Sequence, residues 1–220
     1  MKLTFNRIPS VLLVCKANVC RSPFAAAVLK EDFAGINFLA EVQSAGTQAI
    51  SGQDRCSSST KAIDAKEIST QVSLNINEIE LHSYDLILTA SKAQRSDVLQ
   101  LVPAARDKIF TIVEAAHQSR WLVKPGGALD VAYGKPVDPG LEEILVGIPP
   151  LPENVNERWK WLIGEMHQWR GLTQGVQLLD SGQDIPDPHE SRRNIHAEVF
   201  LQIRESISGF TQNLEIVLSS

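Results

Sequence analysis

A cysteine and an arginine separated by five residues stand near the start of the chain, in the segment Cys15-Lys16-Ala17-Asn18-Val19-Cys20-Arg21-Ser22-Pro23. A loop between a buried strand and a helix N-terminus can turn its backbone N–H groups inward and bind an anion. The guanidinium of Arg21 can donate to two phosphate oxygens at once, and the same positive field favours a thiolate at Cys15. The spacing predicts a phosphate-binding loop made by residues 16–20 and Ser22, with Cys15 as nucleophile and Arg21 as phosphate clamp.

The elements around this loop alternate between strands and helices. Strands are predicted at 10–14, 38–43, 84–88 and 108–112, and helices at 22–32, 56–66, 76–83, 91–102 and from about 113. Such alternation is typical of an α/β protein with a parallel sheet and helices on both faces. Ligands bind to these sheets beyond the carboxyl ends of the strands, which is where Cys15 stands.

The pattern changes from about residue 119. Proline and glycine are frequent over 125–152, and apolar residues then recur at helical spacing from Val155 to Trp169. A final amphipathic helix is predicted from about Ser191. We interpret residues 1–220 as a single domain with a partly helical insert at about 119–183. The insert is expected to pack Trp159, Leu162 and Trp169 onto the parent domain, and its alternative roles are a lid over the site or a homodimer surface.

Three segments in this order resemble the low-molecular-weight protein tyrosine phosphatase family. They are residues 11–23, Ser44-Ala45-Gly46-Thr47 and Ile185-Pro186-Asp187-Pro188. The resemblance covers about residues 8–117 and 184–218. It implies a flavodoxin-like four-stranded parallel sheet and hydrolysis of phosphotyrosine-like monoesters through a phosphocysteine. It implies neither a cofactor nor a metal.

The resemblance also assigns roles by position. Asp187 would protonate the leaving group and then activate water, and Ser22 would donate a hydrogen bond to the Cys15 thiolate. Asn18 would hold a strained turn through contacts with residues such as Ser22 and Ser44, because asparagine tolerates positive φ. Asp138 is a rival for the acid, since proline follows it too. Only Asp187 directly precedes a long amphipathic helix.

Several residues depart from the family pattern. Ala17 stands where most members have glycine, and Lys16 occupies a rim position that is often apolar. His189 and Glu190 replace the tyrosines that follow the acid in eukaryotic members. The segment 69–73 lacks the His and Arg that buttress the loop in many members. These departures leave the physiological substrate open.

Two other functions compete with the phosphatase. An arsenate reductase shares the fold and loop, but its thiol relay needs further cysteines, and only Cys56 is available downstream. A silent phosphate-binding scaffold would need neither a thiol nor an acid.

Zinc at Cys15 and Cys20 would lack two more ligands at usual spacing, so no metal is expected. Cys20 is predicted to capture an oxidised Cys15 as a disulfide, and the alternative is a packing role.

The composition indicates which binding partners and which cellular compartment to expect. The net charge is −5 and no run of Lys or Arg occurs, which argues against nucleic acid. No stretch approaches the ~18 apolar residues of a membrane span. Three cysteines are too few and odd in number for a disulfide framework, which indicates a cytoplasmic protein. The expected partner is a phosphotyrosine-containing protein or a small aryl phosphate.

Overall fold

A computed structural model describes residues 7–62, 72–135, 140, 145–171 and 184–220. Its sheet has four strands in the order β2-β1-β3-β4, and each adjacent pair is parallel. The strands are β1 (Ser10–Cys15), β2 (Glu41–Gly46), β3 (Leu86–Thr89) and β4 (Ile109–Thr111). The predicted four-stranded parallel sheet is therefore confirmed.

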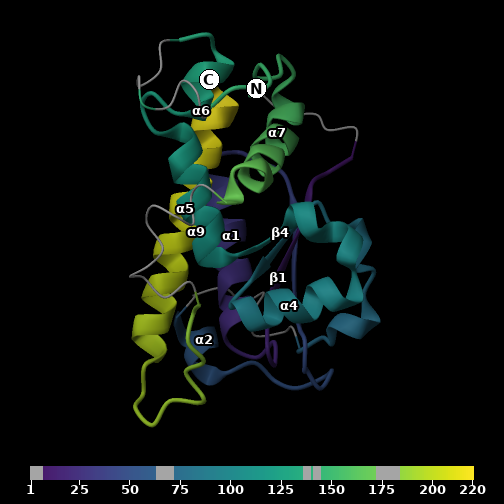
Figure 1. Cartoon of the computed structure of the whole chain (residues 1–220). Helices are drawn as coiled ribbons and strands as arrows, with labels where there is room; N and C mark the ends of the chain where they lie inside the picture. Colours follow the sequence, from purple (N-terminus) through teal and green to yellow (C-terminus); the bar gives the residue numbers. More distant parts are fainter. Residues whose placement is uncertain (1–6, 63–71, 136–139, 141–144, 172–183) are drawn as a thin grey trace.

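Helices connect and cover the strands (Figure 1). The described α-helices are α1 (Arg21–Gly35), α2 (Ser57–Ala62), α4 (Lys92–Leu101), α5 (Ile112–Val123), α6 (Ala128–Ala132), α7 (Val155–Gln168) and α9 (His196–Ser219). Short 3₁₀ helices occupy Ile76–Glu78, Leu81–Ser83 and Pro103–Lys108. Ser91 caps α4 as predicted, because its hydroxyl accepts the backbone N–H of Gln94.

Three of the predicted elements were wrong in type or position. The strand predicted at 38–43 lies at 41–46, because the chain first closes the end of α1, where Phe38 N donates to Phe33 O at 2.8 Å. The segment 76–83 forms two 3₁₀ turns rather than an α-helix. Its buried residues, Ile76 and Leu81, are five apart, and an α-helix would direct them to different sides. The last helix begins at His196 rather than at about 191.

The two faces of the sheet pack against different helices. Leu12 and Val14 point to the face covered by α4 and the 3₁₀ turns, where Val98 lies. Val11 and Leu13 alternate to the other face, which α1, α5, α7 and α9 cover. Helices on both faces are thus confirmed, with the heavier layer on the α9 side, where α5 and α9 lie side by side (Figure 1).

The helix α7 joins the main core through Trp159, which is 1% exposed. Its indole lies 5.2 Å from the Phe38 ring and 6.3 Å from those of Phe33 and Phe210, measured between ring centroids. Phe33 and Phe38 precede β2, so this part of the predicted insert packs near the amino ends of the strands. The predicted packing of Trp159 is confirmed. In Figure 1 α7 lies at the end of the molecule opposite α2.

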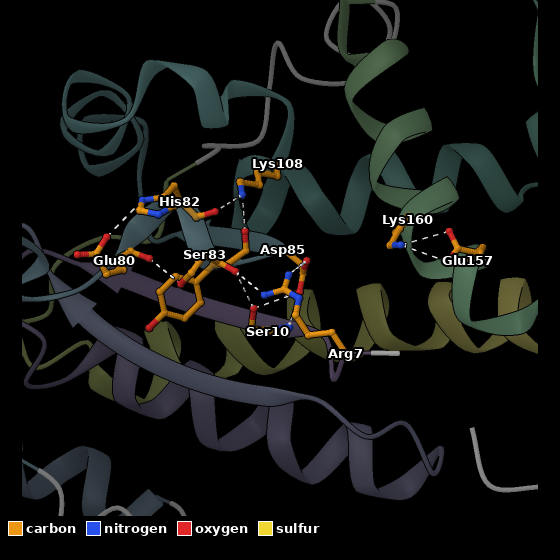
Figure 2. A network of polar contacts seen from close by, with 10 residues as sticks. Arg7, Ser10, Glu80, His82, Ser83, Asp85, Lys108, Glu157 and Lys160 are labelled. Atoms are coloured by element: carbon orange, nitrogen blue, oxygen red, sulfur yellow. Dashed lines mark hydrogen bonds and ion pairs between the residues drawn. The ribbon is translucent and has the colours of Figure 1, made fainter. Parts of the chain in front are cut away.

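A polar network fixes the amino ends of the strands (Figure 2). Arg7 forms an ion pair with Asp85, and the Asp85 carboxylate accepts the backbone N–H of Ser10 at 2.8 Å. Lys108 donates to the carbonyl of His82 at 2.9 Å. These contacts join the starts of β1, β3 and β4, and the loop that contains Cys15 lies at the opposite, carboxyl ends of the strands. Over the described residues, no helix is both long and apolar enough to cross a membrane.

Candidate active site

The loop between β1 and α1 has its carbonyls directed outward. Three of them accept a backbone N–H from outside the loop: Thr47 N to Cys15 O at 3.0 Å, Gln48 N to Lys16 O at 2.8 Å and Cys56 N to Val19 O at 2.7 Å. Because these carbonyls point away from the centre, the loop can present N–H groups inward, beside the N-terminus of α1. The arrangement suits an anion such as phosphate.

The Cys15 thiol lies at the centre of this loop and is 2% exposed. Its Sγ accepts a hydrogen bond from the hydroxyl of Ser22 at 3.0 Å and from the backbone N–H of Asn18 at 3.2 Å. Both donors stabilise negative charge on sulfur. The predicted contact between Ser22 and Cys15 is present.

Asn18 holds the turn of the loop. It has φ of 54°, the left-handed conformation expected for it, and its side-chain amide donates to Ser22 Oγ and to Ser44 Oγ, both at 2.9 Å. Its Oδ1 accepts the N–H of Leu74 at 2.9 Å. Because the left-handed residue is Asn18 and not Ala17, the methyl group of Ala17 is tolerated where most members of the family have glycine.

Arg21 and Asp187 meet over the loop. The Arg21 side chain is 5% exposed and that of Asp187 is 15% exposed, and the two form an ion pair. Arg21 also donates to the carbonyl of Ile185 at 3.1 Å, and Asp187 accepts the N–H of His189 at 3.1 Å. The fold therefore places Asp187, the acid predicted from sequence, in contact with Arg21, the predicted phosphate clamp. The rival, Asp138, lies outside the described residues.

Lys16 and Glu190 form a second link between the loop and the acid segment, at 2.6 Å between Nζ and Oε1. Their hydrogen bond, followed by the attraction of opposite charges, raises the pKa of Lys16 and lowers that of Glu190. Both side chains are exposed, so this pair contributes little stability. It does orient the rim of the site, where the sequence departs from the family.

A cavity of about 410 Å³ opens between the phosphate-binding loop, the acid segment and the start of α4. Arg21 lies in its wall. Four carboxylates also line it, those of Asp97, Asp184, Asp187 and Glu190. Among the described residues that line it there is no aromatic ring. The cavity therefore presents hydrogen-bonding and charged groups to whatever carries the phosphate.

Arg55 is a supporting residue that sequence reasoning missed. Its guanidinium donates to the carbonyl of Asn18, on the outside of the loop. Burial lowers the pKa of Arg55, and the charge of Cys15 opposes that shift. The segment 69–73 lacks the arginine that buttresses the loop in many members, and Arg55 supports the loop from a different segment. A single arginine in a polar stretch carries no signal that could have found it.

Cys20 has surroundings that disfavour its predicted redox role. Burial, followed by the influence of Cys56, raises the pKa of the Cys20 thiol strongly. A thiol that stays protonated captures a sulfenic acid slowly. Burial also lowers the pKa of the nearby His196 imidazole. Disulfide capture of Cys15 stays a prediction.

Gly46 approaches the loop more closely than any side chain could. A Cβ on Gly46 would lie 2.6 Å from Lys16 O and 2.8 Å from Asn18 N. The same residue pairs in register with Cys15, which fixes its place beside the nucleophile. Glycine is required here by close approach.

Substituting Gly46→Ala should therefore displace the loop and lower kcat/KM for p-nitrophenyl phosphate by about 10²-fold. Overpacking should also cost about 1–3 kcal/mol of unfolding free energy. Gly209→Ala is the matched control, because a Cβ there meets nothing within 4 Å. Equal kinetics for the two variants would show that the loop does not depend on this contact.

The family model described as low molecular weight phosphotyrosine protein phosphatase matches residues 10–124, which include the whole loop. The chain belongs to this family. Family membership makes it a cysteine-dependent phosphatase, and it favours that activity over the arsenate reductase alternative.

Two relatives show how far the similarity extends. A probable low molecular weight protein-tyrosine-phosphatase, EpsP of Ralstonia nicotianae, is 30% identical over 109 residues, covering 49% of this chain and 72% of the relative. A protein-arginine-phosphatase of Bacillus subtilis is 31% identical over 140 residues, covering 61% of this chain and 91% of the relative. This member of the family therefore resembles relatives named for two different substrates.

Solved structures agree on the fold. A YwlE mutant from Bacillus subtilis has a TM-score of 0.57 at 17% identity, covering 94% of this chain and 98% of that one. The low-molecular-weight protein tyrosine phosphatase from T. tengcongensis has a TM-score of 0.57 at 19% identity, covering 93% and 98%. The α/β fold expected from the resemblance is thus shared by solved phosphatases.

Proposed function

We propose that the protein hydrolyses phosphotyrosine-like phosphate monoesters through a phosphocysteine on Cys15. The observation that carries this proposal is the position of the Cys15 sulfur, which receives hydrogen bonds from Ser22 and Asn18 inside a loop with outward carbonyls. Arg21 and Asp187 stand together at the same loop. The substrate class is a phosphotyrosine-containing protein or a small aryl phosphate.

In the first step, the Cys15 thiolate attacks phosphorus and the bond from phosphorus to the phenolic oxygen breaks. Protonated Asp187 gives its proton to that oxygen, and the phenol departs. Backbone N–H groups of the loop and the Arg21 guanidinium stabilise the charge on the three equatorial oxygens. The product of this step is the phosphocysteine.

In the second step, water attacks the phosphorus of the phosphocysteine and the sulfur–phosphorus bond breaks. Asp187, now a carboxylate, takes the proton of the water, and inorganic phosphate is released. The hydroxyl of Ser22 donates to the departing thiolate. A related arginine phosphatase of this fold has been solved as a cysteine-to-serine mutant with a phosphorylated active-site serine, which supports a covalent intermediate.

The substitution Asp187→Asn tests the proposed acid. It keeps the size of the side chain but removes the proton, so substrates with poor leaving groups should slow by about 10²–10⁴-fold. Aryl esters with activated leaving groups should slow far less, because they need no proton. The measurement is kcat/KM across a series of aryl phosphates.

Asp97→Asn is the matched control for Asp187→Asn, since it removes a carboxylate from another wall of the same cavity. It should change all esters by a similar small factor. Uniform slowing in the Asp187 variant, or a leaving-group dependence that appears in Asp138→Asn instead, would place the acid elsewhere.

Phosphoarginine is a second candidate substrate. Two observations favour it: four carboxylates and no described aromatic ring line the cavity, and a relative covered over 91% of its length is named a protein-arginine-phosphatase. Carboxylates can accept hydrogen bonds from a guanidinium. A direct comparison of kcat/KM on phosphotyrosine and phosphoarginine peptides of the same sequence decides between the two substrates.

We propose that the whole chain is one phosphatase domain, elaborated at about 119–183. The burial of Trp159 against Phe33 and Phe210 supports this, because the elaboration shares the core of the parent sheet.

The three cysteines are free thiols, which supports the cytoplasmic location predicted from sequence. A homodimer through the elaboration stays a prediction.

A further inference from the structure

Two thiols and two imidazoles converge at the end of the phosphate-binding loop, where α1 begins. They belong to Cys20, the last residue before α1; Cys56, just before α2; His189, beyond the acid; and His196, the first residue of α9. One potential ligand atom from each lies within 4.8 Å of the other three. Neither Cys15 nor Asp187 is part of this group.

The separations suit a tetrahedral metal ion. With Zn–S near 2.3 Å and Zn–N near 2.0–2.1 Å, the edges of a tetrahedral Cys₂His₂ site measure about 3.3–3.8 Å. The Sγ of Cys56 already lies 3.6 Å from the Nε2 of His196. Since every other pair of ligand atoms lies within 4.8 Å, the remaining edges need contractions of at most about 1.5 Å, which side-chain rotations can supply.

The His196 ring is oriented for metal binding. Its Nδ1 lies 2.8 Å from the side-chain oxygen of Asn194, and this acceptor favours the tautomer with hydrogen on Nδ1. The Nε2 lone pair then points to the Cys56 thiol. An oxygen acceptor on the second ring nitrogen is the usual outer partner of a metal-bound histidine.

The backbone around the cluster is held in place by other contacts. The N–H of Cys56 donates to Val19 O at 2.7 Å, and the carbonyl of Cys56 accepts the hydroxyl of Ser59 at 2.7 Å. The N–H of His189 donates to Asp187 at 3.1 Å. A cavity of about 560 Å³ between α2 and α9 has His196 and Asn194 in its wall.

We propose that Cys20, Cys56, His189 and His196 form a zinc site that ties the acid segment to the phosphate-binding loop. Two thiolates and two imidazoles are a donor set that favours Zn²⁺ over the harder divalent cations. Binding releases the two thiol protons, and the two thiolates balance the charge of the ion. Four protein ligands leave no open position, so the ion is structural, and Cys15 remains free for catalysis.

Zinc titration of the reduced, metal-free full chain against a chromophoric chelator tests the site. We expect one zinc per chain in the wild type. Cys56→Ser and His196→Gln should each weaken binding by at least about 10²-fold. His82 is an exposed histidine at the amino end of the sheet, away from the proposed ligands (Figure 2). The control variant His82→Gln should therefore bind zinc as the wild type does.

Cys15→Ser separates this site from the catalytic thiol, and it should keep wild-type zinc affinity. Loss of binding in Cys15→Ser, or unchanged binding in both Cys56→Ser and His196→Gln, would overturn the proposal. Thermal unfolding of each apo variant identifies a folding defect. Cobalt(II) then gives a second readout, because Cys₂His₂ ligation produces the intense visible bands of a tetrahedral thiolate complex.

Hydrogen exchange tests whether the zinc ion tethers the acid segment to the phosphate-binding loop. Zinc should slow hydrogen exchange of the backbone amides over residues 185–196 in the wild type, and it should not do so in His196→Gln. Exchange that is unchanged by bound zinc would refute the tether. Because neither assay involves turnover, their outcome is independent of the proposed phosphatase activity.

Discussion

The substitution Cys15→Ser is expected to lower kcat for p-nitrophenyl phosphate by on the order of 10⁴- to 10⁶-fold, the loss typical of a removed nucleophile. The reason is chemical. The hydrogen bonds from Ser22 and Asn18 stabilise a thiolate, whereas a serine hydroxyl at the same place keeps its proton and attacks phosphorus slowly. The loop itself is unchanged by a substitution of one atom.

The control for Cys15→Ser is phosphate binding, measured by calorimetry with inorganic phosphate. Binding should persist, because the loop backbone and Arg21 supply the contacts and the sulfur supplies none of them. A variant that turns over at the wild-type rate would exclude Cys15 as the nucleophile. If Cys15→Ser unfolds at a much lower temperature than the wild type, the loss of kcat reflects a folding defect instead.

The second large effect is expected for Arg21→Lys, a loss of about 10²-fold or more in kcat/KM. Arginine offers a planar pair of donors to phosphate, and lysine offers a point charge. Arg21 also holds the acid segment, through Ile185 O and the Asp187 carboxylate. One substitution therefore weakens both the phosphate site and the placement of the acid.

Arg7→Lys is the matched control for Arg21→Lys. Arg7 also forms an ion pair with an aspartate, Asp85, but at the amino end of the sheet (Figure 2). The Arg7 variant should keep full activity, since its side chain is largely exposed and far from the loop in the fold. A loss below about threefold in Arg21→Lys would mean that Arg21 does not contact the transferred phosphate.

The two experiments, read together, test how the acid segment is held. Arg21 and Lys16 contact it from the phosphate-binding loop, and the proposed zinc site would add a third link through His189. If the zinc tether operates, the Arg21 variant should lose less activity with zinc bound than without it. The comparison uses the same protein with and without the metal.

The catalytic loop and most of the sheet could be predicted from the sequence. Cys15, Arg21 and the left-handed Asn18 lie within one short segment, where strand, turn and helix signals are local. The hydrogen bonds from Ser22 and Asn18 to the Cys15 sulfur join residues of this one segment. The acid segment was found through its resemblance to the family, and its placement against Arg21 depends on the fold.

The distant residues that support that loop could not be predicted, because they reach it only through the packing of the fold. Gly46 and Arg55 reach it from separate segments, and neither has a periodicity or spacing that refers to Cys15. Cys20 and Cys56 likewise meet His196 only because α9 returns across α1 and α2. Hydrophobic patterns report which face of an element is buried, not which side chains from other elements it meets, and these contacts are set by how the helices pack on the sheet.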